Sequence, residues 1–530
     1  KDVTKKLWGY PELLFQWEWQ LGKILKAQGQ KARGQSEQQE AIRAYGRAAG
    51  HLETARKNYA STTPTFSKDG ETFYLERAEL LLDAAKSARG EDKQNLLQTA
   101  IDSIESRQEA GLRNYFQDEC VTEKSPVGEE RRLQDNEVLL YLVMFGNRIE
   151  SVLKFSDGSM QQETGLCNDC DKKDTLENRI KSFREQEVGE PQKRIITDYS
   201  EVSRNAIGET IIEPLKRGLG DHKINTLLII PVGELLRVPF AALPLDQTTY
   251  LIQKYAIAIL PNWRLSSAPL RPEDLIHLED DRALLAGLTI EPPLSKMEIE
   301  QPEGKIDDSE VCLQRSKAVE TVRGDNRSVC VRPLCFVDKE IKGVEGIIQN
   351  RTTLLGTKFT VGEVESILKN KDYSVIHFST HGYFDHISHD SWLCTYNKDE
   401  TLTINKIEEL LQGKKVKLLT LSACQTALGA EMGLAGIGVK LGTRSALGSL
   451  WSVDDESTSQ LIQHFYKNLE KESLKNNGYS IAKALQKAQL DFLPDSNNKP
   501  ALSSRTDKNK IFMRPYYWAG FLLIGNWQNQ

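Results

Sequence analysis

Two segments of this 530-residue chain end an apolar run in a residue that can take part in catalysis. In the first, the run 375–378 leads into His381 and Gly382. In the second, the run 418–421 leads into Cys424. Short apolar runs predict buried strands, and reacting groups gather at the carboxyl ends of parallel strands. If the two strands are neighbours, an imidazole and a thiol meet at one edge of a sheet.

An imidazole beside a thiol has a clear chemical use. A free thiol has a pKa of about 8.5, and only the thiolate is nucleophilic. His381 can take the proton of Cys424 as attack begins and can then protonate a leaving amine. Gly382 has no Cβ, so its backbone N–H can approach a substrate oxygen and form an oxyanion hole with the N–H of Cys424. We therefore expect His381 and Cys424 to share a water-accessible notch.

Residues 1–125 are predicted to be helical, with apolar residues at helical spacing in 13–25, 41–59, 73–88 and 95–111. Helix pairs of this length are typical of tetratricopeptide repeats, although no second copy of the repeat is clean. An ordinary helical bundle is the alternative. Either arrangement binds partners more often than it performs chemistry.

From about residue 135 the pattern changes to short apolar runs separated by helical stretches. The runs 137–145 and 149–155 flank Gly146-Asn147-Arg148 and predict a hairpin. Further strands are expected at 226–230, 256–260, 283–288, 374–378, 417–421, 445–450 and 516–524. Strands that alternate with helices predict a parallel or mixed sheet covered on both faces. The Pro-, Asp- and Glu-rich stretch 291–331 is predicted to be a mobile surface insertion.

Composition limits the classes of function. The 69 basic and 75 acidic residues give a net charge of −6, which argues against nucleic-acid binding driven by overall charge. No apolar run reaches the roughly 18 residues of a membrane span, and no apolar leader is seen. Eight cysteines in 530 residues are ordinary for a reducing cytoplasm, where we expect the protein to work.

The motifs Ser379–Gly382 and Leu421–Thr426 resemble those of the CHAT domain, a relative of caspases and separase that is often fused to tetratricopeptide repeats. The resemblance covers about residues 135–527 in the family's order, including segments 230–244, 446–458 and 514–525. It implies an α/β, caspase-like mixed sheet flanked by helices, and a cysteine endopeptidase with Cys424 as nucleophile and His381 as base. The helical region resembles that of cyanobacterial members, which include heterocyst-type proteases. The sequence departs from the family at 232–234 and in the insertion.

Substrate preference follows from the same resemblance, because related peptidases with an acidic pocket cut after Arg or Lys. Asp454 and Asp455 follow the strand beside that of Cys424 and could pair with a basic side chain. Glu234 is a weaker candidate, and Ser422 is also assigned to substrate binding. Alternatively, the two aspartates cap the helix that begins near Ser457.

The expected function is therefore a regulated cysteine endopeptidase that cuts a partner protein. The helical region would recruit the protein substrate, or a protein or ribonucleoprotein activator, and a low basal rate would be relieved by a partner, self-cleavage or loop ordering. A non-catalytic adaptor is the alternative. No direct contact with nucleic acid or membrane is expected.

Neither a cofactor nor a metal is expected. The histidines at 377, 381, 386 and 389 lack the His-Glu-x-x-His pattern, and His377 lies inside its strand, as a core histidine would. Cys167 and Cys170 form one C-x₂-C pair with no second pair to complete a zinc site.

Overall fold

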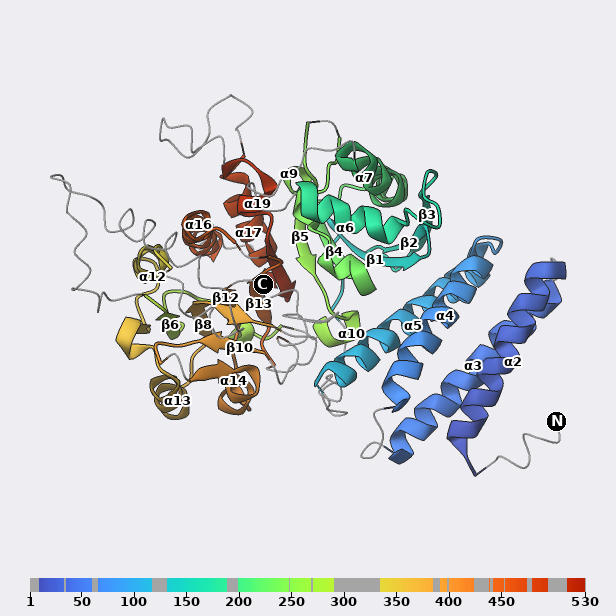
Figure 1. The fold of residues 1–530 in the computed structure, drawn as a ribbon, viewed down its shortest axis with the longest axis horizontal. Helices are drawn as coiled ribbons and strands as arrows, with labels where there is room; N and C mark the ends of the chain where they lie inside the picture. The colour runs from blue at the N-terminus through green and yellow to red at the C-terminus, as the bar shows by residue number, and fades with distance from the viewer. Residues whose placement is uncertain are drawn as a thin grey trace.

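The computed structural model describes residues 9–32, 35–59, 65–116, 131–187, 199–246, 248–267, 270–289, 334–384, 391–397, 400–423, 442–451, 453–473, 479–493 and 512–529, and Gly438. A helical region comes first, and a mixed sheet flanked by helices follows it (Figure 1). The fold class predicted from the sequence is therefore confirmed. Among the described residues, no helix combines the length and the apolar character needed to cross a bilayer.

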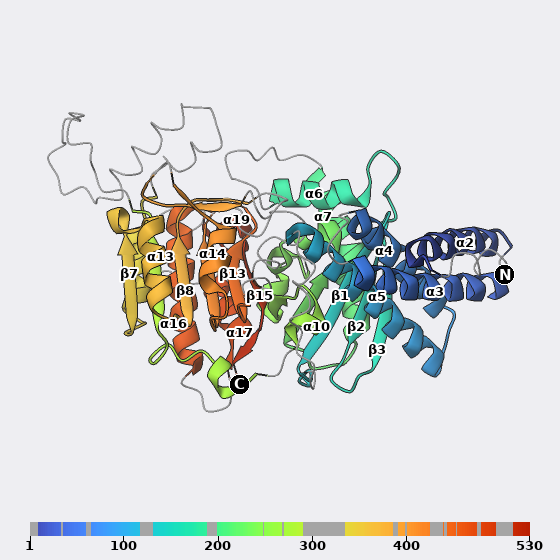
Figure 2. The same cartoon turned by 90° about the horizontal axis from the view of Figure 1, so that it is seen from below.

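The central sheet has eleven strands in the order β3-β2-β1-β4-β5-β15-β13-β12-β8-β6-β7 (Figure 2). Their bounds are β1 (Glu137–Phe145), β2 (Arg148–Lys154), β3 (Met160–Leu166), β4 (Thr226–Pro231), β5 (Ala256–Ile259), β6 (Ala283–Gly287), β7 (Arg351–Leu355), β8 (Val375–Ser379), β12 (Leu418–Ser422), β13 (Ser445–Ser449) and β15 (Phe521–Gly525). Strands β1, β2 and β3 pair antiparallel, as do β13 and β15, and the other neighbours pair parallel. A second, three-stranded sheet contains β9 (Gly382–Tyr383), β10 (Trp392–Cys394) and β11 (Thr401–Thr403).

The parallel strands of the sheet are covered on both faces. Every residue of β4, β5, β6, β8, β12 and β13 is buried, as expected for short apolar strands between two layers of helices. One layer contains α12 (Val337–Glu345), α16 (Asp455–Ser473) and α17 (Ile481–Leu490), and the other contains α13 (Val361–Asn370) and α14 (Ile404–Leu411) (Figure 1). This burial leaves the strand ends as the places where polar side chains can gather.

The helical region consists of two hairpins, α2 (Pro11–Ala32) with α3 (Gln35–Tyr59) and α4 (Thr65–Ala85) with α5 (Gly90–Phe116) (Figure 1). Its aromatic core surrounds Phe73, whose ring centroid lies 5.2 to 5.8 Å from those of Phe15, Trp19 and Tyr45. An ideal Cβ on Gly22 would lie 2.6 Å from the Tyr45 ring, so glycine lets α2 and α3 approach closely. Whether these hairpins are tetratricopeptide repeats stays a prediction.

The hairpin α4–α5 is also anchored to the α/β part of the chain. Its apolar residues, including Leu81, Leu97 and Ile101, belong to the same core cluster as the sheet. Glu105 is buried and accepts the backbone N–H groups of Trp263 and Arg264, at 3.0 and 3.1 Å. The hairpin α4–α5 and the sheet therefore share one hydrophobic core.

Two sequence expectations differ from the structure or lie outside it. The expected strand 516–524 begins only at Phe521, because Pro515 starts a helical turn, α19 (Pro515–Trp518), with its fixed φ at the first helical position. The predicted insertion 291–331 lies outside the described residues.

Candidate active site

Strands β8 and β12, which lead to His381 and Cys424, are neighbours in the sheet. They run parallel with Ser379 opposite Ser422, and the N–H of Thr380 donates to the carbonyl of Ser422 at 3.1 Å. His381 follows Ser379 by two residues, and Cys424 follows Ser422 by two residues. The expectation that these strands are adjacent is confirmed. Cys424 itself lies outside the described residues, which end at Ala423 on this segment.

The backbone after β8 is held by β10. The N–H of Cys394 donates to the carbonyl of His381 at 2.8 Å, and Leu393 stands opposite Gly382 in this antiparallel pair. Because hydrogen-bonded and non-hydrogen-bonded pairs alternate along an antiparallel ladder, the N–H and C=O of Gly382 point away from β10. This is the orientation that an oxyanion donor at Gly382 needs.

Gly382 also sits in a crowded position. An ideal Cβ there would lie 2.8 Å from the Phe384 ring and 3.1 Å from the side chain of Leu393. A larger residue at position 382 would therefore have to displace the Phe384 ring.

His381 is buried, with 5 % of its surface exposed. This differs from the water-accessible notch expected from the sequence. The segments that flank the strand ends, 385–390 and 424–437, lie outside the described residues. In this state the imidazole is shielded from solvent.

The segment that leads to Cys424 is held from the opposite side by β13. The hydroxyl of Ser449, the last residue of β13, donates to the carbonyl of Ala423 at 2.7 Å. Sequence reasoning missed this residue, although serine at the end of a fully buried strand is a signal for a required hydrogen bond.

A buried polar network lies beneath the two strands. His377 Nε2 is 2.8 Å from Glu340 Oε1, and His377 Nδ1 is 3.3 Å from the hydroxyl of Tyr466. That hydroxyl also lies 2.9 Å from Thr420 Oγ1, and Thr420 is directly opposite His377 in the sheet. Burial raises the pKa of Tyr466 above its ordinary range. The interpretation of His377 as a core histidine is confirmed, but its partners on α12 and α16 were missed because they are 37 and 89 residues away in sequence.

The two candidate aspartates point in different directions. Asp455 accepts the backbone N–H groups of Cys335 and Phe336, the latter at 2.9 Å, and burial raises its pKa to about 7. Asp454 accepts the N–H of Ser457 at 2.9 Å, so the capping alternative is confirmed for this residue. The carboxylate of Asp455 is therefore engaged at the start of α12, whereas Asp454 caps α16.

Asp454 also lies close to the segment that precedes the last strand of the sheet. Burial raises the pKa of Tyr517, and the nearby carboxylate of Asp454 raises it further, whereas Arg514 lowers it. The structure thus brings Asp454, Tyr517 and Arg514 together beside the end of β13.

The other two candidates differ in their distance from β8. Ser422 ends β12 and is buried next to Ser379. Glu234 follows β4 and forms an ion pair with Arg237 at 3.2 Å. Strands β5, β15 and β13 lie between β4 and β12, a separation of about 19 Å at the usual strand spacing. The sheet therefore does not bring Glu234 to His381.

No group of three or more His, Cys, Asp or Glu side chains is placed to hold a metal ion within the part of the chain that the structure describes. Cys167 and Cys170, considered above as half of a zinc site, are joined by a disulfide.

Comparison with known proteins gives one family and several distant folds. A model of the CHAT domain matches residues 202–526. Similar solved structures include the Saccharomyces cerevisiae separase–securin complex, with 8 % identity, a TM-score of 0.46, and coverage of 92 % of this chain and 38 % of that chain. The Arg-specific cysteine proteinase gingipain R has 9 % identity and a TM-score of 0.34, with 62 % of this chain and 68 % of that chain covered.

A complex of Porphyromonas gingivalis RgpB pro- and mature domains has the same identity and TM-score, with 62 % of this chain and 70 % of that chain covered. The chain thus spans little more than a third of the separase chain that it matches. No curated protein matches it in sequence.

Proposed function

Because the chain belongs to the CHAT-domain family, we propose that it is a cysteine endopeptidase that cleaves a specific partner protein. Cys424 is the nucleophile and His381 the base in this proposal. The observation that carries it is the level pairing of β8 and β12, with Ser379 opposite Ser422, which brings both strand ends to one edge of the sheet.

The proposed reaction follows from the chemistry of these groups. Cys424 Sγ attacks the scissile carbonyl carbon while His381 accepts the thiol proton, and the resulting oxyanion accepts the backbone N–H groups of Gly382 and Cys424. His381 then donates the proton to the leaving amine, and water hydrolyses the thioester. The direction of the Gly382 N–H, away from β10, supports its role as donor.

A low basal rate is part of the proposal. His381 is only 5 % exposed, and in this proposal a movement that exposes the imidazole raises the rate. We propose that a partner, self-cleavage or loop ordering provides this movement, and that the enzyme works in the cytoplasm.

We propose cleavage after Arg or Lys, with Asp454 as the carboxylate that pairs with the basic side chain. Asp454 follows β13, the neighbour of β12, and shares its surroundings with Tyr517. Asp455 is engaged by two backbone N–H groups, so it serves this role less well. Ser422 would line the adjacent part of the substrate site. Glu234 serves this role least well, because β4 runs antiparallel to β12 and ends at the opposite edge of the sheet.

The helical region is proposed to recruit the substrate, or a protein or ribonucleoprotein activator. Its most exposed apolar side chains share one face of α2 and its leading turn: Tyr10, Leu13, Trp17 and Ile24, with 54, 47, 45 and 56 % of their surfaces exposed. Their spacing of three, four and seven residues makes a stripe suited to a partner helix.

One comparison tests the proposal. Candidate protein substrates are incubated with the unmodified chain, with Cys424→Ala, with His381→Ala and with Cys312→Ala as a cysteine control, and new termini are identified by mass spectrometry. We expect cleavage after Arg or Lys with the unmodified chain and the control, and a loss of at least about a hundredfold with the other two variants. Equal processing by all four proteins would assign the adaptor function instead.

A further inference from the structure

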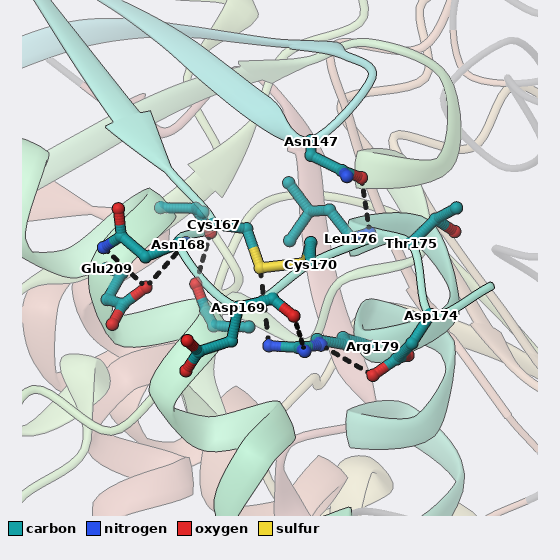
Figure 3. The surroundings of a disulfide bond; sticks show 12 residues. Asn147, Cys167, Asn168, Asp169, Cys170, Asp174, Thr175, Leu176, Arg179 and Glu209 are labelled. Carbon is teal, nitrogen blue, oxygen red and sulfur yellow. Dashed lines mark hydrogen bonds and ion pairs between the residues drawn. A yellow bond between two sulfur atoms is a disulfide. The ribbon is translucent and has the colours of Figure 1, made fainter. Parts of the chain in front are cut away.

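A disulfide joins Cys167 and Cys170 directly after β3, the edge strand of the sheet (Figure 3). Eight strand spacings, about 38 Å, separate β3 from β8 in the sheet order. The pair is therefore distinct from the candidate active site, and the proposed endopeptidase reaction does not use it.

The disulfide adds little as a staple. Only two residues lie between the cysteines, and the stabilisation from constraining the unfolded chain grows with the length of the closed loop. The loop is already fixed by Asn147, whose backbone carbonyl accepts the N–H of Cys167 and whose side-chain oxygen accepts the N–H of Leu176, both at 3.0 Å (Figure 3). A structural role therefore does not account for the bond.

The two sulfurs have different surroundings. Cys167 is buried, with 7 % of its surface exposed, and Arg179 Nη1 lies 3.5 Å from its Sγ. Cys170 is only partly buried. An incoming thiol therefore meets Cys170 first, while a positive charge stands beside Cys167.

The side chain of Arg179 is held in place by hydrogen bonds within this loop. It is 6 % exposed, and its Nε donates to Asp174 at 3.0 Å while its Nη2 donates to the carbonyl of Asp169 at 2.6 Å (Figure 3). A guanidinium is rarely buried without a carboxylate partner. Asp174 is that partner for Arg179, but it binds only the Nε side of the guanidinium. The remaining edge of the guanidinium faces sulfur.

The loop also carries Lys172 and Lys173, which are exposed, and acidic groups that are already engaged. Glu209 accepts the N–H and the side-chain amide of Asn168, both at 3.3 Å. Asp171 accepts backbone N–H groups of its own turn, which lower its pKa. Arg179 is the buried cation that contacts Cys167 Sγ and can stabilise negative charge there.

We propose that Cys167 and Cys170 form a thiol–disulfide exchange site that takes a dithiol as reductant. A thiolate of the dithiol attacks Cys170 Sγ, the Cys167–Cys170 bond breaks, and Cys167 leaves as a thiolate beside Arg179. A positive charge beside the leaving thiolate stabilises it, so the guanidinium directs attack to Cys170. The second thiol of the reductant then attacks its own sulfur in the mixed disulfide and releases Cys170.

The step is balanced by the reductant alone. The dithiol loses two electrons and two protons and becomes a disulfide, while the protein gains two electrons and holds Cys170 as a thiol and Cys167 as a thiolate or thiol. Because Asn147 and Arg179 still hold the loop after reduction, the two sulfurs stay close and the bond can form again.

The first test uses the full chain and dithiothreitol. The purified protein is equilibrated with graded ratios of reduced and oxidised dithiothreitol, alkylated, and analysed by mass spectrometry of the peptide that contains both cysteines. We expect a reversible two-electron transition with an unchanged circular dichroism spectrum. Reduction only together with unfolding in urea, or two free thiols in the absence of reductant, would overturn the proposal.

The second test separates the roles of the two sulfurs. We expect Cys167→Ser, which leaves the accessible sulfur, to attack 5,5′-dithiobis(2-nitrobenzoate) and release thionitrobenzoate at least about tenfold faster than Cys170→Ser does. Equal rates, or a faster reaction of Cys170→Ser, would contradict the assignment of Cys170 as the attacked sulfur.

The third test concerns the cation. Arg179→Gln should slow reduction by dithiothreitol about tenfold, because Cys167 then leaves without a neighbouring positive charge. The matched control is Arg217→Gln, which removes a guanidinium that pairs with Glu163 of β3 at 3.0 Å and does not touch sulfur. Where Arg179→Gln fails to fold, Asp174→Asn serves instead and should accelerate reduction. Unchanged rates in the folded variants would refute the role of Arg179.

Discussion

His377 Nε2 and Glu340 Oε1 lie 2.8 Å apart in the core, and both side chains are almost fully buried. His377 precedes His381 by four residues on β8, and its opposite partner Thr420 precedes Cys424 by four residues on β12. The network that joins them therefore links α12 and α16 to the two strands of the candidate site. A buried ionisable pair carries a large desolvation cost, so replacing one partner should lower the free energy of unfolding substantially.

Glu340→Gln tests this link. Removing the carboxylate leaves the buried His377 with a weaker partner, and we expect the free energy of unfolding to fall by about 2 kcal/mol. Urea denaturation measures this loss. Asp338→Asn is the matched control on α12, because Asp338 forms a solvent-exposed ion pair with Lys342 that should contribute little to stability. Equal stability of the two variants would show that the pair does not support the core.

The two aspartates after β13 should separate specificity from stability. We expect Asp454→Asn to lower cleavage after Arg and Lys by at least about tenfold relative to other P1 residues, because a basic side chain loses its counter-charge. Asp455→Asn should lower the melting temperature and leave the preference unchanged, since its carboxylate holds Cys335 and Phe336. A P1 peptide library and thermal denaturation measure both effects. The reverse pattern would assign the P1 carboxylate to Asp455.

Gly382→Ala tests the crowded turn beside His381. The new Cβ would lie 2.8 Å from the Phe384 ring, so we expect a destabilisation of about 1–3 kcal/mol together with loss of cleavage. Adding Phe384→Ala removes the obstructing ring and should recover part of the stability, which thermal denaturation measures. Equal stability of Gly382→Ala and the unmodified chain would show that a Cβ at position 382 does not clash with the Phe384 ring.

Glu105 should make the attachment of α5 dependent on pH. Burial raises its pKa from 4.5 to about 7, against the lowering effect of the N–H groups of Trp263 and Arg264. Between these two values the folded state binds more protons than the unfolded state. The unfolding free energy therefore falls as pH rises from about 4.5 to 7, by about 3 kcal/mol for this group, and this contribution is constant above pH 7.

Urea denaturation between pH 5 and 8 measures this effect in the unmodified chain and in Glu105→Gln. We expect the variant to lack the fall in stability that Glu105 causes. Glu109→Gln is the control, because Glu109 faces the same Arg264 from the next turn of α5 but at the edge of the contact. The same pH dependence in all three proteins would rule out a titrating Glu105.

The exposed stripe on α2 should matter for partners and not for folding. Trp17→Glu and Ile24→Glu change side chains that are about half exposed, so we expect a change of no more than about 0.5 kcal/mol in stability. Turnover of a short peptide should be unchanged, while cleavage of the native protein substrate should fall. Gln39→Glu, an exposed change on α3, is the control. Equal cleavage of the protein substrate by all variants would remove the stripe from the recruiting surface.

The spacing of apolar and turn residues in short stretches of sequence was sufficient to predict much of the fold. The predicted hairpin forms as β1 and β2, and Gly146 at its turn has a positive φ of 61°. The placement of reacting groups at the carboxyl ends of parallel strands was also expected, and β8 and β12 prove to be neighbours. These features depend on short stretches of chain or on a rule of sheet topology.

By itself, the sequence determined the fold class, the family and the two residues that are proposed to catalyse cleavage. Each of these rests on patterns within short stretches of the chain. Only the tertiary structure decided that His377 pairs with Glu340, that Asp455 turns to the start of α12, and that Cys167 bonds Cys170 beside Arg179. These contacts depend on how distant segments pack and on which side chains are buried together, and no periodicity or spacing in a single chain encodes that information directly.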